Sequence, residues 1–157
     1  MNTNLATGTL SINATQQGTL PLNVSGLVPG DSITRPINLV NDGNLAFGGI
    51  NLATTVGTPS VLTSDAVNGL QKSVRSCALA WTQTANTYSC ASGEKPLGSG
   101  PVMNDVALTG SAALATNGTD YLAYTISLPT TAGNTFQGQT AALSLVFSGS
   151  QLTGTTR

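Results

Sequence analysis

The stretch LPLNVSGLVPGDSITRPINLVNDG, residues 20–43, indicates the fold class, because alternating segments in it flank a tight turn. Apolar side chains stand at every second position from Leu20 to Val24, a period typical of a half-buried β-strand. The turn is Leu27-Val28-Pro29-Gly30-Asp31, where proline fixes φ at the second turn position and glycine accepts a positive φ at the third. The next strand is predicted over Ser32–Val40. Pro36 within it lacks an N–H, which favours a sheet edge or a bulge.

The same alternation predicts further strands on both sides of this stretch. Helix-forming residues are scarce, since Glu and Lys together number three, whereas Thr, Ser, Gly and Asn are abundant. The clearest further segments are Thr9–Asn13, Leu45–Ala53, 122–128 and 143–147. Asn41-Asp42-Gly43-Asn44 predicts a hairpin between the strands that flank it. About seven or eight short strands indicate an all-β protein, an antiparallel β-sandwich of jelly-roll type with short helical or loop insertions.

The middle of the chain carries weaker patterns. Ser64-Asp65 is predicted to cap a short helix that runs to Leu70, because Asp accepts hydrogen bonds from the free amides at a helix start. Val74–Trp81 and Thr82–Cys90 are predicted to form a hairpin. Ser92–Pro101 is rich in glycine and proline and is predicted to be a loop.

Length and composition limit the organisation and the partners. The 157 residues suit one domain, and we expect an N-terminal segment at 1–8 followed by a single domain at 9–157. Charged residues are 7% of the chain and the formal net charge is -1, which excludes nucleic acid as a main partner and eases self-association. No apolar run is long enough to span a bilayer. The start lacks the basic and apolar regions of a secretory signal, so a secreted protein would be in its processed form.

The chain has no histidine, which removes the zinc ligands and proton carriers of common hydrolases. Two cysteines, Cys77 and Cys90, are too few for a thiolate zinc site. We predict that they form a local disulfide worth roughly 3 kcal/mol, which indicates an oxidising, extracellular compartment. The alternative is two buried free thiols in a cytosolic protein. No cofactor is expected.

Acidic and amide residues offer weaker alternatives. Two carboxylates suffice for a glycosidase, and Asp42 with Asn41 and Asn44 would offer oxygen ligands to Ca²⁺. Solvated turns explain the acidic residues better. These are Asp31, Asp42, Asp65, Glu94, Asp105 and Asp120. The sequons at Asn13, Asn23 and Asn117 matter only in an organism that glycosylates its secreted proteins.

Three segments carry a resemblance to a known family. They are Ala6-Thr7-Gly8-Thr9-Leu10-Ser11-Ile12, then Leu27–Arg35 running into Val40–Ala46, and Asn134-Thr135-Phe136-Gln137-Gly138-Gln139 with the later Gly149-Ser150-Gln151. In this order they resemble the TasA/camelysin family of secreted bacterial proteins, whose turns match Pro29, Gly30, Asp31, Asn41, Gly43, Gln137 and Gly138. Residues 54–110 match only loosely.

The resemblance implies a secreted jelly-roll subunit of extracellular biofilm-matrix fibres. Family members polymerise by donor-strand complementation, in which the N-terminal segment of one subunit fills a groove of its neighbour. The implied donor strand comprises Asn2, Thr3, Asn4, Leu5, Ala6, Thr7 and Gly8, with Leu5 as the main apolar anchor. The partner would be another copy, with other matrix or cell-wall components. The family's older label of metallopeptidase needs ligands that this chain lacks, so we expect no enzyme.

Two other functions stay open at this point. A monomeric binding module for cell wall, polysaccharide or another matrix protein would bind through its loops and form no polymer. A secreted hydrolase would lose its activity when one carboxylate is mutated.

Overall fold

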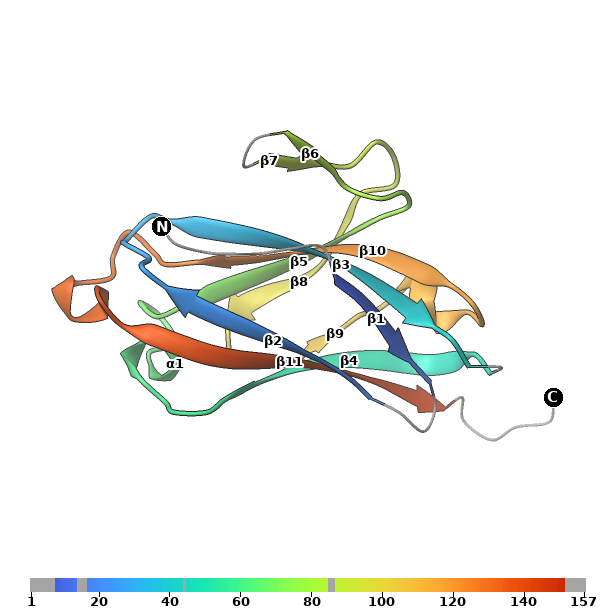
Figure 1. The fold of residues 1–157 in the computed structure, drawn as a ribbon, viewed down its shortest axis with the longest axis horizontal. Coiled ribbons are helices and arrows are strands. Elements are labelled where there is room, and N and C mark those ends of the chain that lie inside the picture. The colour runs from blue at the N-terminus through green and yellow to red at the C-terminus, as the bar shows by residue number, and fades with distance from the viewer. Residues whose placement is uncertain (1–7, 14–16, 44, 85–86, 152–157) are drawn as a thin grey trace.

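The computed structural model describes residues 8–13, 17–43, 45–84 and 87–151. Two β-sheets face each other in it, and a small hairpin stands away from one of them (Figure 1). The all-β sandwich predicted from the alternating pattern is thus confirmed. The described residues form more strands than predicted, because several are only two or three residues long.

The first sheet has the strand order β1-β3-β10-β5-β8. Its strands are β1 (Gly8–Ile12), β3 (Ser32–Asn41), β10 (Thr119–Ser127), β5 (Gln71–Cys77) and β8 (Lys95–Pro101). β1 runs parallel to β3, whereas the other pairs are antiparallel.

The second sheet has the order β2-β11-β4-β9, all antiparallel. Its strands are β2 (Gly18–Ser25), β11 (Thr140–Gln151), β4 (Phe47–Val56) and β9 (Val106–Ala107). The separate hairpin consists of β6 (Thr82–Thr84) and β7 (Thr87–Ser89). The helical turns are α1 (Val61–Ser64), η1 (Ala112–Leu114) and η2 (Asn134–Phe136).

The hydrophobic core fills the space between the two sheets. Alternate residues of β10 (Leu122, Tyr124 and Ile126) are buried at 1% exposure each, as expected for a strand with one face turned inward. Phe147 of β11 and Leu52 of β4 come from the opposite sheet and are fully buried. The alternation of the sequence therefore positions the core directly.

The predicted Asp42-Gly43 hairpin is wrong, because β3 and β4 belong to different sheets. Asn41 makes this connection instead: its side chain accepts from the N–H of Gly43 (3.0 Å) and donates to the carbonyl of Leu45 (3.0 Å). An Asp-Gly pair indicates a chain reversal, but the reversal here carries the chain from one sheet to the other.

The predicted loop at Ser92–Pro101 is wrong from Lys95 onward, where the chain forms β8 against β5. Proline and glycine suit this strand because it lies at the sheet edge. Gly98 is also required by packing: a Cβ there would lie 2.7 Å from Val106 Cγ1.

The predicted helix lies earlier in the chain. Ser60, not Ser64 or Asp65, caps α1, in a capping box with Thr63. Asp65 instead accepts the N–H groups of Val67 and Asn68 (2.9 Å each), which closes the following turn.

The predicted hairpin in the middle is shorter than expected. β5 leaves it to pair with β10 and β8, and only β6 and β7 pair with each other. The disulfide between Cys77 and Cys90 is present, with a sequence separation of 13 residues.

Candidate functional site

The acidic residues do not converge on a site. In the part of the chain that the structure describes, no three His, Cys, Asp or Glu residues come close enough to hold a metal ion. Asp120 is fully buried in β10 and not in a solvated turn, which corrects the prediction for this residue. Its carboxyl group accepts from the hydroxyls of Ser76 and Ser111, the latter at 2.5 Å. This cluster joins β5, η1 and β10 inside the fold, so we assign Asp120 a structural role.

The turns that carry the family resemblance are structural too. Gly30 has φ +94°, as predicted, and the N–H of Asp31 donates to the carbonyl of Val28 (2.9 Å). Gly138 has φ +74°, next to Gln137, whose N–H donates to Asn134 (3.2 Å). Asn41 and Gly43 form the connection described above. The turns at 28–31 and 137–138 lie at one end of the sandwich, where Thr140 pairs with Ser25, and the connection at 41–43 lies at the other end (Figure 1), so the turns do not form one site.

The other predicted residues stand as follows. Asn2, Thr3, Asn4, Leu5, Ala6 and Thr7 lie outside the described residues. Gly8 is the first residue of β1. Of the sequon residues, Asn23 and Asn117 are exposed, and Asn13 donates to Asp42 (3.3 Å).

The most distinctive feature is an open edge of the first sheet. β1 pairs only with the second half of β3, from Gly8 opposite Ile37 to Ile12 opposite Asn41. Residues 32–36 of β3 pair with β10 on one side and with no described strand on the other. β2, at the edge of the second sheet, likewise pairs only with β11 among the described residues. Within the part of the chain that the structure describes, the sandwich is therefore open on this side.

The bonds at the two ends of β3 show which backbone groups face the open edge. The N–H of Leu128 donates to the carbonyl of Asp31, and the N–H of Asn41 donates to the carbonyl of Gly118, both at 3.0 Å. Odd-numbered residues of β3 thus direct their backbone groups towards β10. Since the direction alternates along an antiparallel strand, even-numbered residues direct theirs the other way.

Among the described residues, the open edge consequently presents the N–H and C=O of Ser32 and Thr34. Pro36 has no N–H to donate, and it sits opposite Ala123 at the last position before β1 begins. β3 lies between β1 and β10 in the sheet order, so the prediction that Pro36 lies on an edge strand is wrong, although residues 32–36 have a described strand on one side alone. Unpaired groups of this kind are a template for another strand.

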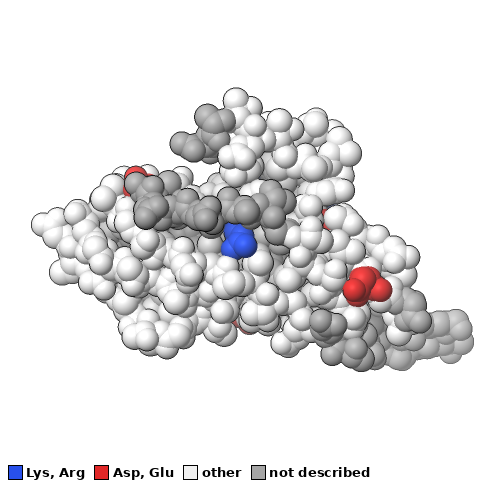
Figure 2. All heavy atoms as spheres, in the orientation of Figure 1, with Lys and Arg blue, Asp and Glu red and all other residues white. Residues whose placement is uncertain are grey.

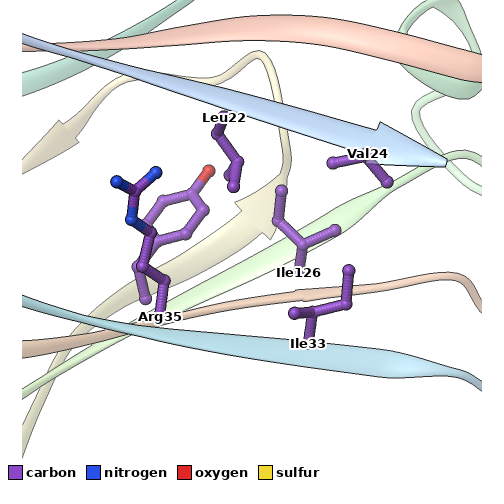
Figure 3. Close-up of a pocket in the computed structure, with 6 residues that line it drawn as sticks. Leu22, Val24, Ile33, Arg35 and Ile126 are labelled. Carbon is purple, nitrogen blue, oxygen red and sulfur yellow. The ribbon is translucent and has the colours of Figure 1, made fainter. Parts of the chain in front are cut away.

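A narrow groove lies behind this edge, between the two sheets. It is lined by Leu22, Val24, Ile33, Arg35, Tyr124 and Ile126. Figure 3 shows Leu22 and Val24 extending from β2 towards Ile33 and Arg35 of β3. The space inside is about 10 Å³, enough for one water molecule.

Arg35 spans this groove. Its Nη1 donates to the carbonyl of Pro21 in β2 at 2.6 Å. Burial lowers the pKa of the guanidinium, and no acidic side chain pairs with it among the described residues, where the one ion pair joins Arg75 to Glu94. Figure 2 shows that charged side chains are sparse and isolated on this face of the molecule.

The β6–β7 hairpin is a second exposed feature, fixed at its base. The Nε1 of Trp81 donates to the carbonyl of Tyr121 (2.8 Å), and Arg75 lies 4.9 Å from the centre of the Trp81 ring. The disulfide closes the same base. Figure 1 shows the hairpin projecting from the first sheet.

Sequence reasoning missed Arg35 and Tyr124 as groove residues. The signal available was the inward position of Arg35, two residues from Ile33 and Ile37 in an alternating strand. That position alone does not say that the described part of β1 begins opposite Ile37.

A family model described as camelysin metallo-endopeptidase matches residues 1–156. A search of curated proteins found no significant relative. Within the described residues, no helix has the length and apolarity that a membrane crossing requires.

Proposed function

The chain belongs to the camelysin family, and on that premise we propose that it is a secreted structural subunit of extracellular matrix fibres. The N-terminal segment of one copy docks on the open edge of β3 in the next copy. The observation that carries this proposal is that residues 32–36 of β3, beside an apolar groove, have no described strand on the side away from β10.

The length of the segment fits the length of the edge. Residues 32–36 of the edge are five residues, as are residues 3–7 of the donor, and the donor lies opposite them if it continues the β1 register from the position where Gly8 of the acceptor pairs with Ile37. Five extended residues span about 17 Å. A strand supplied by a neighbour gains main-chain hydrogen bonds along this edge. Because donor segment and acceptor edge are different surfaces, the contact is head-to-tail and builds an open filament.

The composition also supports assembly through large contacts. Charged residues are 7% of the chain, so few charges would need a partner when subunits pack together. Other matrix or cell-wall components remain candidate partners for the exposed β6–β7 hairpin.

The residues present do not fit the metal site that the family description suggests. The chain has no histidine, and both cysteines are joined in the disulfide. All six acidic residues lie among the described residues, where no three of them meet. Zinc peptidases hold their metal with three protein ligands, His and carboxylate in the common classes. We therefore derive no metal-dependent step and propose a structural role.

The proposal is tested by blocking one backbone donor of the open edge. Thr34→Pro removes the N–H that faces outward and leaves the β3–β10 ladder intact, since Thr34 directs its backbone groups away from β10. Thr34→Val is the matched control. Both variants lose the hydrogen bond between the hydroxyls of Thr34 and Thr125 (2.8 Å), but only the proline loses the N–H.

We expect concentration-dependent filaments in electron microscopy from the unmodified chain and from Thr34→Val. Thr34→Pro and a chain without residues 1–7 are expected to remain single subunits. Melting temperatures show whether each variant is folded. Filaments of folded Thr34→Pro would contradict docking at this edge. If the unmodified chain stays monomeric at all concentrations, a binding module becomes the better explanation, and the β6–β7 hairpin becomes its first candidate surface.

A further inference from the structure

Arg35 connects the two sheets at the mouth of the groove by one hydrogen bond to a described residue. Its acceptor is the carbonyl of Pro21. Ala142 of β11 accepts from the N–H of Gly57 on the β4 side (3.2 Å), so Ser144 also directs its backbone groups to β4, and the pair Pro21–Ser144 is not a hydrogen-bonded pair of the β2–β11 ladder. That carbonyl therefore points away from β11, towards the open side. This bond uses one of the five N–H donors of the guanidinium group.

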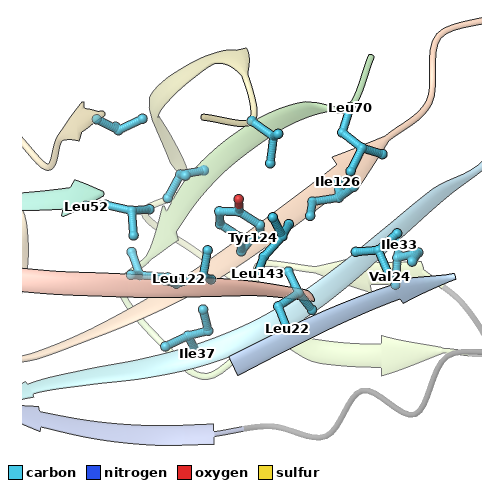
Figure 4. Packing of buried hydrophobic residues seen from close by; sticks show 14 of the residues in the cluster. Leu22, Val24, Ile33, Ile37, Leu52, Leu70, Leu122, Tyr124, Ile126 and Leu143 are labelled. Atoms are coloured by element: carbon cyan, nitrogen blue, oxygen red, sulfur yellow. The ribbon is translucent and has the colours of Figure 1, made fainter. Parts of the chain in front are cut away.

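Several buried polar atoms around the groove lack partners. Within the described residues, Arg35 Nε, Thr54 Oγ1 and Tyr124 Oη are buried without a hydrogen bond. Tyr124 is 1% exposed, and burial strongly raises its pKa. The nearby Thr54 hydroxyl partly offsets this rise of the Tyr124 pKa, although the two hydroxyl groups do not have the geometry of a hydrogen bond. Figure 4 shows Tyr124 in the interior with Leu122 and Leu143.

Unpaired buried donors cost stability unless something satisfies them. Arg35 is half-buried, and its Nε has no hydrogen-bond acceptor among the described residues. The proposed occupant, residues 1–7 of a second copy, contains no acidic side chain but carries a backbone carbonyl at each residue. The backbone carbonyls of this segment are therefore neutral oxygen acceptors for the Arg35 guanidinium.

We propose that Arg35 is the latch of the docking groove: it holds the mouth closed on Pro21 in the free subunit and donates to a backbone carbonyl of the docked N-terminal strand in the fibre. This inference rests on the proposed function and names the residue that retains the strand. In the continued β1 register, Ala6 lies opposite Arg35. A small side chain suits the narrow space there.

The test measures dissociation of a fluorescent synthetic peptide of residues 1–12 from the full chain, held below its assembly concentration. Arg35→Met keeps the length and apolar stem of the side chain and removes its donors. Arg35→Lys keeps the charge without the planar fork. Thr34→Val serves again as the control that leaves both Arg35 and the edge N–H in place. Melting temperatures separate loss of folding from loss of retention.

We expect the peptide to leave Arg35→Met about tenfold to a hundredfold faster than the unmodified chain, with Arg35→Lys between them. A second set of peptides replaces one backbone amide at a time, over residues 3–7, by an ester, whose carbonyl is a weaker acceptor. At one position the ester should speed dissociation from the unmodified chain but not from Arg35→Met.

The outcomes separate the two proposals. If the peptide binds, Thr34→Pro abolishes binding and Arg35→Met releases the peptide no faster, then the docking edge stands and the latch is wrong. If each ester speeds dissociation by the same factor from Arg35→Met as from the unmodified chain, at every position, then Arg35 bonds to none of these carbonyls. Arg35 then acts only on the fold, and the latch is wrong. If the unmodified chain binds no peptide, both proposals fall.

Discussion

Replacing Asp120 by alanine is expected to be the most damaging change of an acidic residue in this chain. Asp120 is fully buried, and Ser76 and Ser111, each 4% exposed, donate their hydroxyls to its carboxyl group. Alanine leaves two buried hydroxyls without an acceptor, at about 1–3 kcal/mol each, and adds a small cavity. We expect a loss of about 3–5 kcal/mol, which lowers the melting temperature by roughly 6–20 °C for a domain of this size.

The assay is urea unfolding followed by far-ultraviolet circular dichroism, with thermal melting beside it. Asp42→Ala is the matched control, because Asp42 is exposed and accepts one bond of 3.3 Å from Asn13. It is expected to cost under about 1 kcal/mol. Asp120→Asn keeps one acceptor oxygen and should lose less than the alanine variant. If Asp120→Ala costs no more than the control, the cluster does not stabilise the junction of β5, η1 and β10.

Three further predictions follow from particular side chains. Lys72 is 3% exposed and donates to the carbonyl of Val102 (3.1 Å), and desolvation lowers its pKa from 10.5 to about 8, with Asp105 opposing the shift. Between these values the unfolded chain binds more protons, so the free energy of unfolding should rise with pH by at most about 1.4 kcal/mol per unit, a slope that Lys72→Met removes. Reduction of the Cys77–Cys90 disulfide should cost about 3 kcal/mol and red-shift Trp81 fluorescence, whereas unchanged fluorescence would show that the hairpin base holds without it. If Leu5 is the apolar anchor, Leu5→Asp should abolish filaments. If the donor follows the continued β1 register, Leu5 faces outward and Ala6 faces the groove, so filaments should survive Leu5→Asp and be lost in Ala6→Leu. Electron microscopy of the two variants decides between these registers.

Much of the local structure was predictable because it depends on single residues. The positive φ of Gly30 follows from a turn that proline initiates. The disulfide follows from two cysteines at short separation.

The errors concern pairing partners over long distances. Asp42-Gly43 reverses the chain as predicted, yet the strands on either side enter different sheets. The segment from Lys95 is a strand although proline and glycine are poor strand formers, because it closes an edge against β5. Tertiary contacts override local propensity in both places.

The sequence by itself determined the all-β class, the core faces and the exclusion of histidine chemistry, since these depend on alternation and composition. Only the tertiary structure decided that β1 covers half of β3 and that Arg35 reaches across to β2. Register and sheet order arise from contacts between residues far apart in the chain, and a pattern of period two is equally satisfied by many pairings. The candidate docking edge results from the pairing of β1 with β3, so no local sequence motif predicts it.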